Sequence, residues 1–249
     1  MDRETDMPGQ ITKLSRNFIL IGIFAVAMGL LEAIVVVYLR QIYYPRGFDF
    51  PLTLLSPRMV AVESSREAAT IVMLVSVAII AGRDSLRRFA YFIHIFAVWD
   101  ICYYLCLKVL LDWPPSLFTW DILFLIPVPW AGPVLAPLIC SLTMLIMAGT
   151  IIRLQETGCM VRIGPPEWGL ALLGAAVILF TFVRDYSGII LSGDLHPLLR
   201  DPAKNGELIE AVARYRPTHY QWGLFILGEI LILCSLMLAW RSAATRRPQ

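Results

Sequence analysis

The sequence has little charge for its length. Of 249 residues only 16% are charged, whereas 58% are apolar and the mean hydropathy is +0.69. Soluble chains carry about 25% charged residues, so a soluble globular protein is excluded. A long Lys/Arg cluster is also missing and the net charge is only +2, which argues against a nucleic-acid partner. The composition indicates an integral membrane protein in contact with a lipid bilayer.

Cysteine and local motifs are sparse as well. Five cysteines, 16 glycines and 16 prolines do not fit a disulfide scaffold, a collagen-like chain or a disordered one. The sequence has no CxxC or HExxH motif, no Walker loop and no dinucleotide fingerprint, and its three histidines are not paired by spacing. We therefore predict no metal site, and the sequence identifies no cofactor.

Six apolar runs are long enough, with their flanks, to cross a bilayer. A span of about 30 Å needs roughly 20 residues, because only helical hydrogen bonding satisfies the backbone there. The runs are 17–38, 67–81, 89–111, 122–152, 168–183 and 221–240. They predict an all-α, polytopic membrane helix bundle with about six transmembrane helices. No repeat or soluble second domain is visible, so 1–249 is expected to form a single transmembrane domain.

The fourth run cannot be one straight helix. It contains Pro127, Pro129, Pro133 and Pro137, and each proline removes a backbone donor and clashes with the preceding turn. We therefore predict a short helix over 116–125, a break over 126–132 and a second helix after it. Broken membrane helices are tolerated where they are buried or line a cavity.

An even number of spans places both termini on one side. If the tails, 1–17 and 241–249, are cytoplasmic, the inside connections and tails hold 11 Lys and Arg, whereas the longer outside connections hold nine. This agrees with the positive-inside rule and favours a bacterial inner-membrane protein. Residues 185–220 are then extracytoplasmic, and Asp201 and Pro202 are expected to begin an amphipathic helix that runs to Arg216.

Charged residues inside the first two spans are informative. A charge at the bilayer centre costs about 2.5–3.5 kcal/mol or more, so it usually faces the bundle interior. Glu32 lies beside a row of small residues that would let another helix approach. Glu63, Arg66 and Glu67 have i, i+3, i+4 spacing, which puts them on one helix face. We expect Arg66 to hold both of these carboxylates charged.

The later segments add further polar residues. Asp100, Tyr104 and Lys108 fall on one stripe of the third span. Glu229 lies inside the sixth span, and Asp121 is expected near the start of a helix, where the helix dipole favours a negative charge.

Four acids from four helices lie at similar depth. They are Glu32, Glu67, Asp100 and Glu229. We hypothesise that they converge on an outward-facing cavity that binds or conducts a small ion, a proton or a polar solute. Arg66 and Lys108 would supply counter-charges, and the broken fourth run with segment 185–220 would form a gate.

Other classes of function fit the same residues. The charges could form a structural network that fixes helix register, as in a non-catalytic subunit that assembles with other membrane proteins. Alternatively, the protein could be a membrane-embedded enzyme acting on a lipid-linked substrate. Glu63, Glu67 or Asp121 would then be its acid or base, because paired carboxyls can divide these roles.

Overall fold

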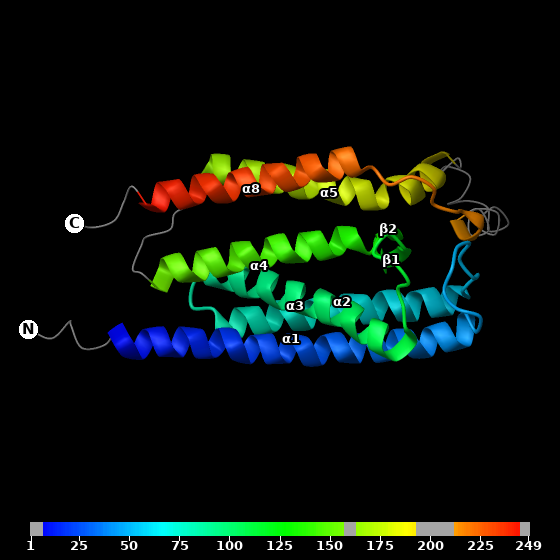
Figure 1. Cartoon of the computed structure of the whole chain (residues 1–249), viewed down its shortest axis with the longest axis horizontal. Coiled ribbons are helices and arrows are strands. Elements are labelled where there is room, and N and C mark those ends of the chain that lie inside the picture. The colour runs from blue at the N-terminus through cyan, green and yellow to red at the C-terminus, as the bar shows by residue number, and fades with distance from the viewer. Residues whose placement is uncertain (1–6, 157–162, 193–211, 245–249) are drawn as a thin grey trace, which may run out of the picture.

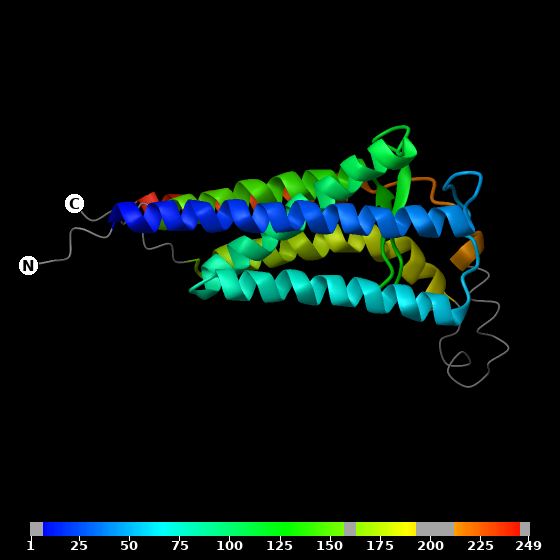
Figure 2. The ribbon, with the colours of Figure 1, turned by 90° about the horizontal axis from the view of Figure 1, so that it is seen from below.

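Six apolar helices form a bundle that can span a membrane. The computed structural model describes residues 7–156, 163–192 and 212–244. Figures 1 and 2 show the helices running side by side, with the N-terminal and C-terminal ends of the chain at one end of the bundle. We call this the termini end and the opposite one the hairpin end. The predicted all-α, six-span bundle is confirmed.

The bounds of these helices are α1 (Met7–Tyr43), α2 (Pro57–Ala81), α3 (Ser85–Leu111), α4 (Leu135–Glu156), α5 (Pro165–Ser192) and α8 (Trp222–Ala244). Four of the helices, α1, α2, α3 and α5, contain the apolar runs that predict them and extend beyond these runs, whereas α4 covers only the second part of the fourth run. Local signals explain the starts of α2 and α3. The Ser56 hydroxyl accepts from the Met59 amide at 3.2 Å, and the Asp84 carboxylate accepts from the Arg87 amide at 2.9 Å. Such N-caps satisfy amide groups that have no partner within the helix.

Small residues set the closest helix crossings. A Cβ added to Gly29 of α1 would lie 2.8 Å from the Trp99 carbonyl oxygen of α3, so the two backbones touch there. Ala25 and Ala33, one turn to either side, are fully buried. The predicted close approach along this row is confirmed. A Cβ on Gly174 of α5 would lie 2.6 Å from the Gly228 carbonyl oxygen of α8. These crossings pair α1 with α3 and α5 with α8.

A β-hairpin replaces the predicted short helix over 116–125. Strands β1 (Trp120–Phe124) and β2 (Trp130–Pro133) are antiparallel, with Asp121 opposite Gly132. The predicted break is in the right place, but the segment before it is extended. β1 is rich in aromatic and β-branched residues, which favour strands, and the following prolines lack the donors that a helix needs. Figure 2 shows the hairpin crossing the bundle between the helices.

The segment 185–220 also differs from the prediction. α5 continues to Ser192, so the first eight residues of 185–220 belong to a helix and not to a connection. The amphipathic helix expected from Asp201 to Arg216 falls mostly outside the described residues.

Candidate functional site

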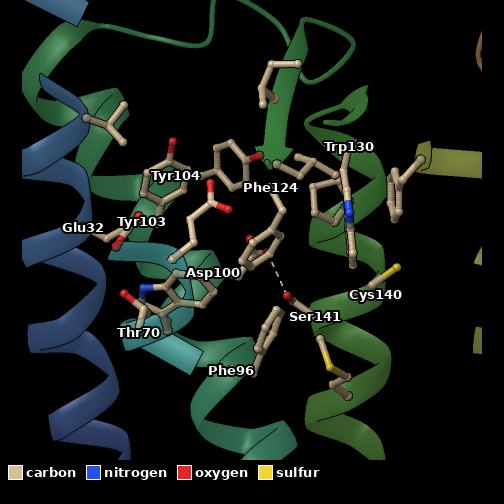
Figure 3. Close-up of a pocket in the computed structure, with 18 of the residues that line it drawn as sticks. Glu32, Thr70, Phe96, Asp100, Tyr103, Tyr104, Phe124, Trp130, Cys140 and Ser141 are labelled. Atoms are coloured by element: carbon tan, nitrogen blue, oxygen red, sulfur yellow. Dashed lines mark hydrogen bonds between the residues drawn. The ribbon is translucent and has the colours of Figure 1, made fainter. Parts of the chain in front are cut away.

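A cavity of about 210 Å³ lies where the hairpin meets the helices. It is lined from α1, α2, α3, α4, α5 and both strands of the hairpin (Figure 3). The polar and aromatic lining residues are Glu32, Arg66, Glu67, Thr70, Phe96, Trp99, Asp100, Tyr103, Tyr104, Phe124, Trp130, Cys140, Ser141 and Phe182. At about 30 Å³ per water molecule, this volume corresponds to roughly seven waters.

Arg66 joins α1 to α2 at the cavity wall. Its Nε donates to the Glu63 carboxylate at 2.8 Å, and its Nη1 donates to the Glu32 carboxylate. The sequence led us to expect Glu63 and Glu67 as its two partners. That expectation was wrong for Glu67, because the guanidinium turns toward α1 and bridges the helices instead. Glu32 and Glu63 are therefore compensated by one shared cation.

Glu67 binds the backbone at the end of β1. Its Oε2 accepts a hydrogen bond of 2.8 Å from the Leu125 amide, just after β1. A backbone donor without a partner costs several kcal/mol inside a membrane, so non-helical backbone needs such an acceptor. The same carboxyl also lines the cavity, and it forms no ion pair with any described residue.

Asp100 faces the cavity with a single neutral donor. The Ser141 hydroxyl of α4 donates to its Oδ2 at 2.8 Å, as drawn in Figure 3. Within the ranges that the structure describes, no arginine or lysine pairs with it. Asp100 is thus a partly buried carboxyl whose negative charge has no direct counter-ion.

Asp121 is the centre of a second polar cluster, the Asp121 cluster, which lies toward the hairpin end and also contains Arg40 and Tyr104. Arg40 donates to its Oδ1 at 3.1 Å and Tyr104 to its Oδ2 at 3.2 Å, and Asp121 is 2% exposed. The Arg40 guanidinium also stacks over Trp113, 3.7 Å from the ring centroid. The expectation that Asp121 begins a helix was wrong, since it lies in β1. Arg40 was not predicted as a site residue because the first apolar run ends at Tyr38, two residues before it, whereas α1 continues to Tyr43.

A second cavity, of about 160 Å³, adjoins the first. The two share Val36, Arg66, Glu67, Tyr103 and Ile122 as lining residues. The second is also lined by Arg40, Asp121 and the connection between α1 and α2, which lies at the hairpin end. Polar side chains therefore follow one another from that end of the bundle to the Asp100 cavity.

Four predicted site residues do not line the Asp100 cavity: Glu63 and Asp121 line the second cavity, and Lys108 and Glu229 line neither. Lys108 is half exposed and pairs with Asp112 at 2.7 Å, and this contact lowers the pKa of Asp112. It is therefore not a counter-charge for the buried acids, because it lies one turn beyond Tyr104 toward the helix end. Glu229 accepts from the Thr143 hydroxyl at 2.7 Å and is not among the lining residues, although Cys140 interacts with it and does line the cavity.

Neither a group of metal-binding residues nor a comparison with known proteins assigns a function to this cavity. No group of three or more His, Cys, Asp or Glu residues among the described ones could hold a metal ion. Comparison of the chain with models of protein families, with curated proteins and with solved structures found no match. The geometry of the cavity is therefore the basis for any functional assignment.

Proposed function

We propose that this multi-pass membrane protein binds a small polar solute in the Asp100 cavity and exchanges a proton at that site. The observation that carries the proposal is a cavity inside an apolar bundle whose wall holds two carboxyls, Glu67 and Asp100, that form no ion pair with any described residue. A buried charge without a partner costs far more than a paired one. Such a carboxyl is stabilised by taking up a proton or by a cationic ligand.

The surroundings of Asp100 favour a functional role over a purely structural one. Structural buried charges are normally paired and hydrogen-bonded on both oxygens, as Asp121 is. Asp100 has one hydroxyl donor and open space beside it. Intramembrane acids that face a cavity in this way occur in proton relays and solute pathways.

We propose that the hairpin end faces the outside of a bacterial inner membrane and that both termini are cytoplasmic. The excess of Lys and Arg at the termini end supports this orientation. Leu54 and Ser85 are exposed and lie at opposite ends of the bundle. In a cysteine-free background, a membrane-impermeant thiol reagent added to intact cells should label Leu54→Cys and spare Ser85→Cys. The reverse pattern would invert the proposed orientation.

The proton exchange can be tested without knowing the solute. Infrared difference spectra of the purified protein between acidic and alkaline buffer should contain a carbonyl band from a protonated carboxyl. The band should be lost in Asp100→Asn, which keeps the shape of the side chain and can keep the contact with Ser141. Asp112→Asn is the matched control, because Asp112 is exposed and its left-handed conformation (φ 50°) suits asparagine. An Asp100→Asn spectrum identical to that of the unchanged protein would refute Asp100 as the site.

A further inference from the structure

The lining of the cavity is aromatic as well as acidic. Four of its rings contact one another: Phe96 and Trp99 at 5.1 Å between centroids, Phe124 and Trp130 at 5.2 Å, and Trp99 and Phe124 at 6.1 Å. They come from α3, β1 and β2, so the hairpin completes an aromatic wall that the helices alone would lack. In Figure 3 the labelled rings of Phe96, Phe124 and Trp130 surround the same space as Asp100.

The acidic and aromatic lining of the cavity favours a positively charged ligand. The three carboxyls in the wall, Glu32, Glu67 and Asp100, face one arginine, Arg66, which is already bound to Glu32 and Glu63. Among the described residues, the only cation stacked on aromatic rings is Arg40, and its rings, Phe48 and Trp113, lie beside the Asp121 cluster and do not line the Asp100 cavity. No described cation is therefore stacked on the cavity rings, and a cation from solution is attracted within about 6 Å of a ring centroid.

The kind of cation follows from size and ligand type. A cavity of about 210 Å³ is too large for one dehydrated metal ion, and the described residues offer no group of three metal ligands. An aromatic wall with one or two carboxyls is instead the usual setting for an organic ammonium group. The volume is also below the roughly 300–1,000 Å³ of sites for drug-sized ligands, so the solute must be small.

Trp99 adds a hydrogen-bond donor. Its side chain lines the cavity and is 7% exposed, and its Nε1 has no hydrogen-bond partner within the described part of the chain. Buried indole N–H groups usually find an acceptor. A solute with an oxygen atom beside its ammonium group would supply one.

We infer that the solute is a small organic cation, with its ammonium group against Asp100 and the aromatic wall and an acceptor oxygen near Trp99. The inference rests on the proposed function and specifies its substrate class. Asp100 supplies the charge, Phe96, Phe124 and Trp130 supply the ring faces, and Glu67 adds a second negative charge while holding the hairpin in place.

A pair of isosteric probes tests the substrate class. Choline and 3,3-dimethyl-1-butanol have nearly the same shape and the same hydroxyl, and only choline is charged. Calorimetric titration of the purified full-length protein should show saturable binding of choline and at least about tenfold weaker binding of the neutral alcohol. Asp100→Asn should weaken choline binding by a similar factor, and Asp112→Asn should leave it unchanged.

The outcomes separate the two proposals. Equal binding of both probes would overturn the cation assignment while leaving a solute site. If neither probe binds but the Asp100-dependent infrared band is present, the cation inference is wrong and the proton site stands. If the band is also missing, both proposals fail. Phe124→Leu provides a second variant that does not depend on Asp100: it removes one ring face, and unchanged choline affinity in a folded sample would contradict the aromatic role.

Discussion

Two intramembrane aspartates in neighbouring parts of the bundle, the buried Asp121 and the partly buried Asp100, have different environments. Asp121 receives hydrogen bonds on both oxygens from Arg40 and Tyr104, and aromatic rings cover the arginine. Asp100, one turn before Tyr104 on α3, receives one hydroxyl donor and borders a cavity of about 210 Å³. The Asp121 cluster joins the hairpin to α1 and α3, whereas the second oxygen of Asp100 accepts no hydrogen bond from a described residue.

The comparison distinguishes a structural charge from a functional one. Removing Arg40 from the Asp121 cluster leaves a buried carboxylate without its cation, so stability should fall. Removing the charge of Asp100 leaves nothing unpaired, so stability should change little while binding and proton exchange are lost. Stability and ligand measurements on matched variants therefore test the distinction directly.

The largest effect is expected for Arg40→Met. This change keeps much of the apolar part of the Arg40 side chain but leaves the Asp121 carboxylate without a counter-ion. The free energy of unfolding should therefore fall by about 3–5 kcal/mol. The measurement is unfolding of the purified protein in a denaturing detergent. Arg46→Met is the control, because Arg46 lies in the exposed connection after α1. Adding Asp121→Asn to Arg40→Met should restore part of the lost free energy of unfolding. If it restores none, the loss of the Arg40–Asp121 ion pair is not the cause of the instability.

The hairpin links the two regions, and Gly132→Ala tests that link. Gly132 pairs with Asp121 across the hairpin, and an added Cβ would lie 2.9 Å from two ring carbons of Phe182, a buried residue that also lines the cavity. We expect a loss of about 1–3 kcal/mol in the free energy of unfolding from this overpacking, together with weaker choline binding. Gly188→Ala, where an added Cβ meets nothing within 4 Å, should cause neither change. Equal effects of both substitutions would show that the hairpin does not couple the regions.

The sequence predicts the helices better than it predicts the site. Hydropathy locates all six spans, because crossing a bilayer imposes a length and a composition that short windows detect. The hairpin was missed because its strands are short and because the Leu125 amide after β1 is satisfied by a distant side chain, Glu67 of α2, which no local pattern reveals. Asp100 and Glu32 were found because an acid in an apolar run stands out. The hydrogen bond from Ser141 to Asp100 was not predicted, because a serine inside a helix is common and Asp100 lies on another helix.

A smaller effect is expected for Trp99→Phe. The change keeps an aromatic ring in the wall and removes the Nε1 donor, which has no partner among the described residues. Stability should stay within about 1 kcal/mol, and choline affinity should fall about two- to tenfold, the value of one hydrogen bond. Tetramethylammonium, which has no acceptor oxygen, should bind both forms equally. A matching loss for this second probe would assign the effect to altered packing.

The smallest effect is expected for Lys108→Met. Lys108 and Asp112 form an exposed pair at the end of α3, and such pairs are screened by water and salt, so the unfolding transition should not shift measurably at neutral pH. The contact lowers the pKa of Asp112, so its small contribution exists above the ordinary pKa of aspartate and disappears as the pH falls through the lowered value. Any difference between the two forms should therefore vanish in acid. Choline binding should also be unchanged, since Lys108 does not line the cavity. A clear loss of choline binding in Lys108→Met would show that Lys108 belongs to the binding site. The exposed end of α3 and the Asp100 cavity would then not be independent.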